Sequence, residues 1–323
     1  MIADEIVWQL HGEALQGLHE RQHLLLIPSG EAAKSLDEAK HCWLFCKDNK
    51  LDRRACILSL GGGATTDLAG FVAAGFMRGI DVIHIPTTLL AMVDAAIGGK
   101  TGVNLTDAKN YVGAFHAPRQ ILCHLPWLST LAHREYVSGF AEVIKYGLIA
   151  DPELFCFLEE NAEKLVARDT QALRHIVERS IQIKSDIVEQ DFKEQNLRQH
   201  LNLGHTFAHA IESATDYTSY LHGEAVAIGL CASARTSQHL GMQGTATTKR
   251  VEALCSQLNI PTQLHTCLSS SYLISLMKRD KKAVSNNITL IVSPNLGEAQ
   301  TVQNIPEQIL QSVWREVGAD AGM

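Results

Sequence analysis

A change in hydrophobic pattern near residue 133 is the feature that most constrains the fold of this chain. Before it, short apolar runs typical of buried strands stand at 23–27, 55–60 and 82–85. Segments with helical periodicity stand between and before them, at 4–20, 31–49 and 66–77. Strands that alternate with helices indicate a parallel sheet. Because the first of these segments is a predicted helix, we expect the sheet to be short at that edge.

After about residue 130 the periodicity is helical almost throughout. The predicted helices are 134–149, 151–167, 170–191, 198–215, 222–240 and 246–258, and a single late strand is predicted at 288–292. A length of 323 residues suits two domains. We therefore predict a Rossmann-like α/β domain over 1–132 and a mainly α-helical domain over 133–323. A cleft between two such domains is a common place for a binding site.

Composition excludes several classes of protein. An apolar content of 46% with 20% charged residues provides for a large core and argues against disorder. The net charge of -7 argues against a general nucleic-acid binder, although a local basic pocket could still hold a phosphorylated small molecule.

Targeting signals and cysteines indicate the compartment. The first residues carry acidic groups and no basic segment, so we expect no signal peptide. The apolar stretch 80–99 is interrupted by charged residues and by Pro86, so we expect no membrane span. The eight cysteines include no CxxC pair and lie among apolar neighbours, which is typical of buried thiols in a reducing compartment. These features predict a cytoplasmic protein without nucleic-acid or membrane partners.

A glycine-rich turn follows the second predicted strand. Gly61-Gly62-Gly63 stands between an apolar strand and a helix. Backbone amides at the start of a helix favour phosphate groups, and glycine lets a pyrophosphate approach closely. The pattern is neither GxGxxG nor a P-loop, and a simple tight turn explains it equally well. A second glycine cluster, Ile97–Gly102, carries Lys100.

The stretch 201–209 contains candidate metal ligands. Read as one helix, it places Asn202, His205 and His209 on one face. His222 begins a later predicted helix, and Glu142 is a carboxylate within an apolar one. Two histidines and a carboxylate with an open position form a known catalytic zinc site. The pattern is not HExxH, and each histidine alone is as well explained by the core or the surface.

Several charged residues stand in apolar surroundings. Lys145 and Lys184 lie within apolar helical segments, and Asp94 lies within an apolar run. A charge in such a place is costly unless it is paired or works in a site. The side chains that could together neutralise a phosphate and a carboxylate are Arg78, Lys100, Lys109, Lys145, Lys184 and Arg198.

Taken together, these stretches resemble the 3-dehydroquinate synthases. The matching segments run in order from about residue 29 to 291 and include SLGGGATTDLAGFVAAGFMRG, IPTTLLAMVDAAIGGKTGVN, KNYVGAF, GFAEVIKYGLI, LRQHLNLGHTFAHAIE, LHGEAVAIG and RDKK. The resemblance implies a phosphate-eliminating lyase that converts 3-deoxy-D-arabino-heptulosonate 7-phosphate into 3-dehydroquinate in the shikimate pathway. The fold is shared with sugar-phosphate cyclases and with iron-containing alcohol and glycerol-1-phosphate dehydrogenases.

The same resemblance implies cofactors and roles. The metal, Zn²⁺ or alternatively Co²⁺, is expected on Glu142, His205 and His222. NAD is expected on Glu31, Lys34, Gly63, Ala64, Thr65, Thr66, Asp67, Thr87, Thr88, Lys100, Lys109, Trp127, Leu128, Ser129 and Thr130. Substrate and catalytic positions are Arg78, Asp94, Lys100, Asn110, Lys145, Lys184, Glu194, Arg198, Asn202 and His209. One lysine of Lys281-Lys282 is expected to close over the substrate, and a homodimer is expected.

The chain departs from the family pattern in two places. Thr66 replaces a glycine of the turn, and we expect its hydroxyl to cap the helix so that the turn survives. The family also carries about one βα-unit more before the segment that matches Asp4–Val7, which puts NAD affinity in question. Alternatives are a related sugar-phosphate cyclase, a metal- and NAD-dependent alcohol dehydrogenase of the same fold, or an inactive paralogue.

Overall fold

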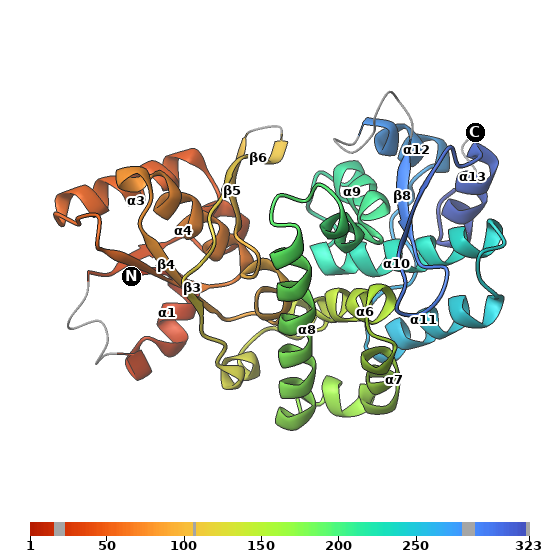
Figure 1. Cartoon of the computed structure of the whole chain (residues 1–323), viewed down its shortest axis with the longest axis horizontal. Helices are drawn as coiled ribbons and strands as arrows, with labels where there is room; N and C mark the ends of the chain where they lie inside the picture. Colours follow the sequence, from red (N-terminus) through yellow and green to blue (C-terminus); the bar gives the residue numbers. More distant parts are fainter. Residues whose placement is uncertain (16–22, 106–107, 280–287, 321–323) are drawn as a thin grey trace. The chain divides into compact units, whose positions relative to one another are not determined.

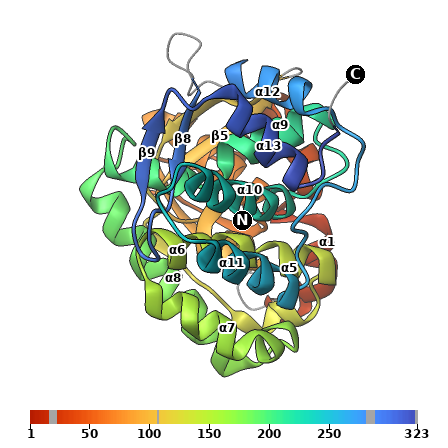
Figure 2. The same ribbon diagram turned by 90° about the vertical axis from the view of Figure 1, so that its right-hand side faces the viewer.

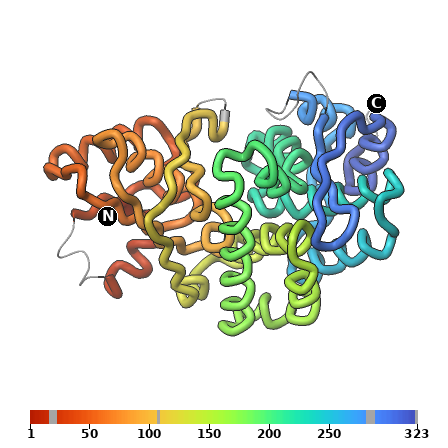
Figure 3. The backbone as a smooth tube through the Cα atoms, viewed as in Figure 1, coloured from red at the N-terminus to blue at the C-terminus, as the bar shows by residue number. Residues whose placement is uncertain are grey.

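The computed structural model in Figure 1 describes residues 1–15, 23–105, 108–279 and 288–320. The chain divides into two compact units, Met1–Ala132 and His133–Met323. Figure 3 follows the backbone through the first unit, in red to yellow, and the second, in green to blue. The predicted fold class, a parallel sheet with helices followed by a mostly helical region, is confirmed.

The first unit is built on a five-stranded parallel sheet of order β2-β1-β3-β4-β7. Its strands are β1 Ile2–Asp4, β2 Leu25–Ile27, β3 Cys56–Gly61, β4 Asp81–Pro86 and β7 Gln120–Ile121. The helices are α1 Glu5–His11, α3 Leu36–Asp48 and α4 Gly63–Gly75, with short turns η1 Glu13–Leu15, η2 Gly30–Ala33, η3 Phe76–Arg78, η4 Ala91–Ala95 and η5 Leu125–Ser129.

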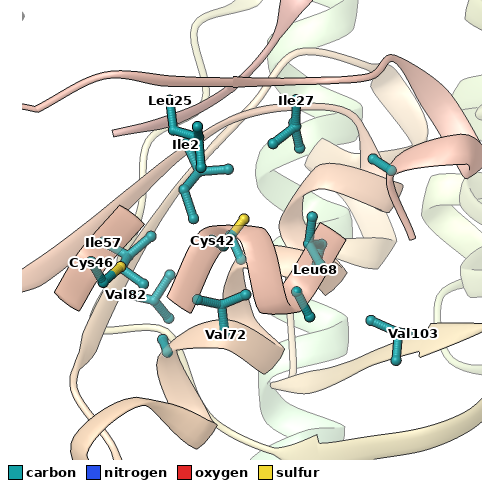
Figure 4. Packing of buried hydrophobic residues seen from close by; sticks show 14 of the residues in the cluster. Ile2, Leu25, Ile27, Cys42, Cys46, Ile57, Leu68, Val72, Val82 and Val103 are labelled. Carbon is teal, nitrogen blue, oxygen red and sulfur yellow. The ribbon is translucent and has the colours of Figure 1, made fainter. Parts of the chain in front are cut away.

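The two faces of this sheet bury different side chains. Alternate strand residues such as Ile2 and Val82 pack with α3 and α4 (Figure 4). Cys42 and Cys46 of α3 belong to that core, as expected of buried thiols, whereas Cys56 and Cys267 are exposed and contradict that expectation. On the other face, Ala3 and Leu60 pack with residues of α1.

The predicted helix over 4–20 corresponds to α1, which begins at Glu5 but ends at His11, and the strand before it was not predicted. The chain opens with strand β1, which pairs with β2 and β3 and therefore occupies an inner position of the sheet. Asp4 then caps α1, because its Oδ1 accepts hydrogen bonds from the amides of Ile6 and Val7 at 2.9 and 3.1 Å. Three residues are too few for the alternation that identifies a strand.

A β-hairpin completes the first unit. Strand β5, Lys100–Leu105, pairs antiparallel with β6, Ala108–Phe115. This hairpin was not predicted, and the second glycine cluster runs into its first strand.

The second unit is mainly helical. Its helices are α5 His133–Ser138, α6 Phe140–Ile149, α7 Pro152–Val166, α8 Thr170–Gln190, α9 His205–Ala214, α10 His222–His239, α11 Thr245–Gln257, α12 Ser270–Arg279 and α13 Glu307–Glu316, with a 3-10 turn η6 at Leu197–Asn202. Strands β8 Thr289–Val292 and β9 Gln300–Gln303 form an antiparallel pair. Helices α12 and α13 and strand β9 were not predicted.

Helix α10 lies at the centre of this unit. It contacts α6, α9, α11 and α13 (Figure 2). Its residues are nearly all buried as far as Ser237, and most are alanine, glycine, serine or cysteine. Small side chains let neighbouring helices approach closely, so α10 brings together the helices that carry the candidate ligands.

Among the described helices, none is both long and apolar enough to cross a membrane.

Candidate functional site

Three predicted metal ligands converge in the second unit. Glu142 lies on α6, His205 is the first residue of α9 and His222 is the first residue of α10. One donor atom from each lies within 4.8 Å of the others. Glu142 Oε1 is 3.5 Å from His205 Nε2 and 3.7 Å from His222 Nε2. Donors bound at about 2.0–2.1 Å to a tetrahedral zinc ion would stand roughly 3.4 Å apart.

Close approaches between backbones bring these helices together. A Cβ atom at Gly229 of α10 would lie 2.1 Å from the carbonyl oxygen of Gly204, which directly precedes His205. A Cβ atom at Gly223 would lie 1.9 Å from the carbonyl oxygen of Ser138, just before α6. Both positions therefore require glycine. Gly223 holds the start of α10 against the segment before α6, and Gly229 holds the middle of α10 against the segment before α9.

Each histidine is held through its second ring nitrogen. His205 Nδ1 is 3.1 Å from the carbonyl oxygen of Leu203, which can only accept, so this nitrogen carries the proton. His222 Nδ1 is 3.1 Å from Glu212 Oε1. A proton on Nδ1 leaves the Nε2 lone pair available on the side of Glu142. Metal-binding histidines commonly have such partners.

The carboxylate of Glu142 is fully buried and its two oxygens have different surroundings. Oε2 accepts a hydrogen bond from Lys145, which is buried on the same helix. Oε1 has no hydrogen-bond partner among the described residues. A buried carboxylate oxygen without a donor is costly. A divalent cation between Oε1 and the two imidazoles would satisfy it, so this donor set fits a metal ion.

The other predicted substrate and catalytic residues of the second unit lie on α8, η6 and α9 or between them. The ring of His209 is centred 5.8 Å from that of His205. Asn202 donates to Glu194 Oε1 at 2.9 Å. Lys184 of α8 is buried, and Arg198 in η6 is buried with Nη1 donating to the carbonyl of Phe192 at 2.6 Å. Lys281 and Lys282 lie outside the described residues.

One geometric expectation was wrong. Asn202 does not share a helix with His205 and His209, because η6 ends at Asn202 and α9 begins at His205. Gly204 separates them with a left-handed φ of 80°. This break is what turns the carbonyl of Leu203 toward the His205 ring.

In the first unit, the glycine turn connects β3 to α4 as predicted. Helix α4 begins at Gly63, and Gly62 at its N-cap offers no side chain to the first amides. Thr66 does not cap the helix. Its hydroxyl lies within the first turn and donates to the carbonyl of Gly63 at 2.9 Å, and the turn forms without it. Ala64 and Thr65 belong to the same turn.

Two predicted cofactor residues next to this turn form an ion pair. Lys34 Nζ lies 2.5 Å from Asp67 Oδ2, and the lysine side chain is only 5% exposed. Burial by itself lowers the pKa of Lys34, but the charges of Asp67 and Glu31 outweigh it and raise the pKa above its usual value. Lys109 Nζ is 4.0 Å from Glu31, and Asn104 donates to Glu31 at 2.8 Å.

The remaining predicted residues of this unit are spread over several turns. Thr87 is buried and donates its amide to Gly61, and the Thr88 hydroxyl accepts from the amide of Ala91. Trp127, Leu128, Ser129 and Thr130 lie in or next to η5. Asp94 is half-buried in η4, and the exposed positions are Arg78, Lys100 and Asn110.

Two residues that were not predicted as site residues contact predicted ligand-binding residues. Glu212 contacts His222, and Asn104 contacts Glu31. Glu212 stood at the end of the matched segment LRQHLNLGHTFAHAIE, directly after Ala210 and Ile211. Its place in that segment is the signal that could have identified it.

Comparisons with known proteins agree with this geometry. Residues 24–138 match a family model described as 3-dehydroquinate synthase N-terminal, and residues 139–283 match 3-dehydroquinate synthase C-terminal. The 3-dehydroquinate synthase of Opitutus terrae is 42% identical over 322 residues, which cover 99% of this chain and 88% of that protein. The 3-dehydroquinate synthase of Geotalea uraniireducens is 44% identical over 275 residues, 85% of this chain and 76% of that protein.

Solved structures give the same result for the fold. The 2-epi-5-epi-valiolone synthase ValA of Streptomyces hygroscopicus, with NAD⁺ and Zn²⁺ bound, superposes with a TM-score of 0.91 at 28% identity, covering 98% of this chain and 89% of that one. A 2-deoxy-scyllo-inosose synthase superposes with a TM-score of 0.89 at 24% identity, covering 98% of this chain and 90% of that one, and supports the fold alone. Since both halves of the chain match in order and a relative aligns over almost its whole length, the chain belongs to the 3-dehydroquinate synthase family.

Proposed function

We propose that this protein catalyses the reaction of its family, the conversion of 3-deoxy-D-arabino-heptulosonate 7-phosphate into 3-dehydroquinate and phosphate. The observation that carries the proposal is the convergence of His205 and His222 on Oε1 of Glu142. This buried oxygen has no hydrogen-bond donor among the described residues. This cluster stands in a chain that matches both halves of the family.

The proposed reaction uses a divalent metal and NAD. Glu142, His205 and His222 would hold the metal, for which Zn²⁺ suits the donors and Co²⁺ can substitute. The start of α4 with Glu31 and Lys34 would hold NAD. When bound, the metal acidifies a substrate hydroxyl and NAD accepts and returns a hydride, so the overall reaction is redox-neutral. The NAD⁺ and Zn²⁺ in the ValA structure support both assignments.

The chain's own residues have separate tasks in this proposal. Lys145 binds Oε2 of Glu142 and leaves Oε1 for the metal. His209 is close enough to the ring of His205 to serve as a proton relay beside the metal. Lys184 and Arg198, both buried cations, would bind the anionic groups of the substrate. A homodimer stays a prediction from the resemblance, and a cytoplasmic location stays a prediction from the sequence.

The alternatives differ in what they would produce. A related sugar-phosphate cyclase would use another sugar phosphate, and an alcohol dehydrogenase would accumulate NADH. An inactive paralogue would release no phosphate. The identity of about 42–44% to 3-dehydroquinate synthases, against 28% to the valiolone synthase, favours the proposed substrate.

The test is release of phosphate from the heptulosonate phosphate with NAD present. We expect phosphate and 3-dehydroquinate in equal amounts without net NADH. Removal of the metal with a chelator should abolish the release, and Zn²⁺ or Co²⁺ should restore it. Net NADH formation, or no turnover by metal-loaded protein supplied with NAD, would contradict the proposal.

A further inference from the structure

We propose that Glu212 is a positioning residue for His222. It sets the orientation of the His222 ring and keeps the proton on Nδ1, so that Nε2 can bind the metal. The inference rests on the proposed function, because it assumes a metal on Glu142, His205 and His222. Glu212 is not itself among the converging donors of the described residues. It acts through the imidazole that it contacts.

The two histidines are held to different degrees. The side chain of His205 is 12% exposed, and its Nδ1 is held by the backbone carbonyl of Leu203. The side chain of His222 is 36% exposed, and its Nδ1 contacts the side chain of Glu212. Packing therefore constrains its ring less, and the contact with Glu212 matters more for its orientation.

Glu212 is placed to accept a hydrogen bond from His222 and not to compete for the metal. It lies on α9 with its side chain 7% exposed, and its Oε1 is 3.1 Å from Nδ1. A carboxylate that accepts from Nδ1–H leaves the Nε2 lone pair toward Glu142 Oε1, 3.7 Å away. Such a contact also makes the imidazole a stronger donor. The ligand and its support come from neighbouring helices, α10 and α9.

Metal binding by Glu212→Ala and Glu212→Gln variants tests this role. Metal-free protein is titrated with Zn²⁺ against a chromophoric chelator, and the visible absorption of bound Co²⁺ reports the ligand geometry. We expect Glu212→Ala to bind Zn²⁺ about 10- to 100-fold more weakly and to alter the Co²⁺ spectrum. Glu212→Gln keeps an acceptor oxygen but loses the charge, so we expect a smaller loss. If the alanine variant fails to fold, the isosteric glutamine variant decides.

Asp151→Asn is the matched control. Asp151 is also a buried carboxylate of this unit, where it caps α7 and pairs with Arg179. This variant should lose stability and keep the Zn²⁺ affinity and Co²⁺ spectrum. Unchanged metal binding in both Glu212 variants would overturn the role of Glu212. Failure of the unaltered protein to bind metal would instead overturn the metal centre of the proposed function, so the two failures are distinguishable.

Discussion

At the scale of single residues, Glu142 serves two groups at once. One oxygen accepts from the buried ammonium of Lys145, and the other faces the two imidazoles. Removing one member of a buried ion pair leaves an uncompensated charge, which is among the larger single-residue penalties. The stability of the metal-free protein and its metal affinity should therefore depend on the same side chain.

Glu142→Gln is expected to lose both properties. It removes the buried carboxylate that pairs with Lys145, which should cost on the order of 3 kcal/mol of unfolding free energy. It also removes the anionic ligand, so Zn²⁺ affinity should fall. Urea unfolding of metal-free protein and chelator competition measure the two effects. The control is Glu159→Gln, which breaks the half-exposed pair with Arg250 and should cost less than Glu142→Gln. Equal losses in both variants would show that Glu142 has no special burial cost.

The raised pKa of Lys34 predicts that the unfolding free energy of the protein depends on pH in the alkaline range. Burial opposes its charge, yet Asp67 and Glu31 raise its pKa above the ordinary 10.5. A raised pKa in the folded state means that folding favours the protonated form. The stabilisation is thus fully present below pH 10.5 and is lost as the pH rises through the folded pKa.

The Lys34→Met variant tests this sign. Its unfolding free energy should lie below that of the unaltered protein at pH 7 to 9, and the gap should narrow as the pH rises above about 10.5. Urea unfolding at a series of pH values measures the gap. A gap that is constant with pH would mean that Lys34 contributes packing and not charge.

At the scale of elements, long periodic segments could be predicted and short or glycine-dependent ones could not. Helices α8 and α10 extend over many turns, so their periodicity is clear in the sequence. Strand β1 has three residues, and nothing local distinguishes it from the start of α1. In the hairpin, a Cβ atom at Gly113 would lie 2.2 Å from the carbonyl oxygen of Thr101, so glycine there permits strand pairing. Its sequence signal resembles that of a loop.

The candidate site shows the same limit. Spacing suggested His205 and His209, and the sequence context added Glu142 and His222 as candidates. The resemblance then selected Glu142, His205 and His222 as the ligand set. The break at Gly204 and the contact with Glu212 depend on how α9 meets α10, which no local pattern encodes. Tertiary packing decides both.

Gly229→Ala tests whether the approach of α9 and α10 forms the site. Alanine within a helix normally stabilises it by about 0.5–1 kcal/mol relative to glycine. Here the added methyl group would meet the carbonyl oxygen of Gly204, so we expect a loss of about 3 kcal/mol and weaker Zn²⁺ binding. Gly244→Ala, where no atom lies within 4 Å, should change stability by less than about 1 kcal/mol. A stabilised Gly229→Ala protein would contradict the close approach.

At the scale of the whole molecule, each unit has its own core and its own proposed ligand. The sheet and α4 belong to the first unit, and the candidate metal ligands belong to the second. A ligand that binds only the folded state suppresses the opening of the structure that holds it. Metal and NAD should therefore protect different parts of the chain.

Hydrogen exchange followed by mass spectrometry separates the two effects. Zn²⁺ should slow amide exchange in α6 and at the starts of α9 and α10, because it joins the three helices through Glu142, His205 and His222. NAD should slow exchange in the turn between β3 and α4. At a ligand concentration about 100 times Kd, linkage limits the protection to roughly 2.7 kcal/mol.

The Glu142→Gln variant should lose the protection by Zn²⁺ and keep the protection by NAD. Zn²⁺ protection that survives in this variant at the same peptides would place the metal on other side chains, and NAD protection outside the first unit would contradict the glycine turn as its site.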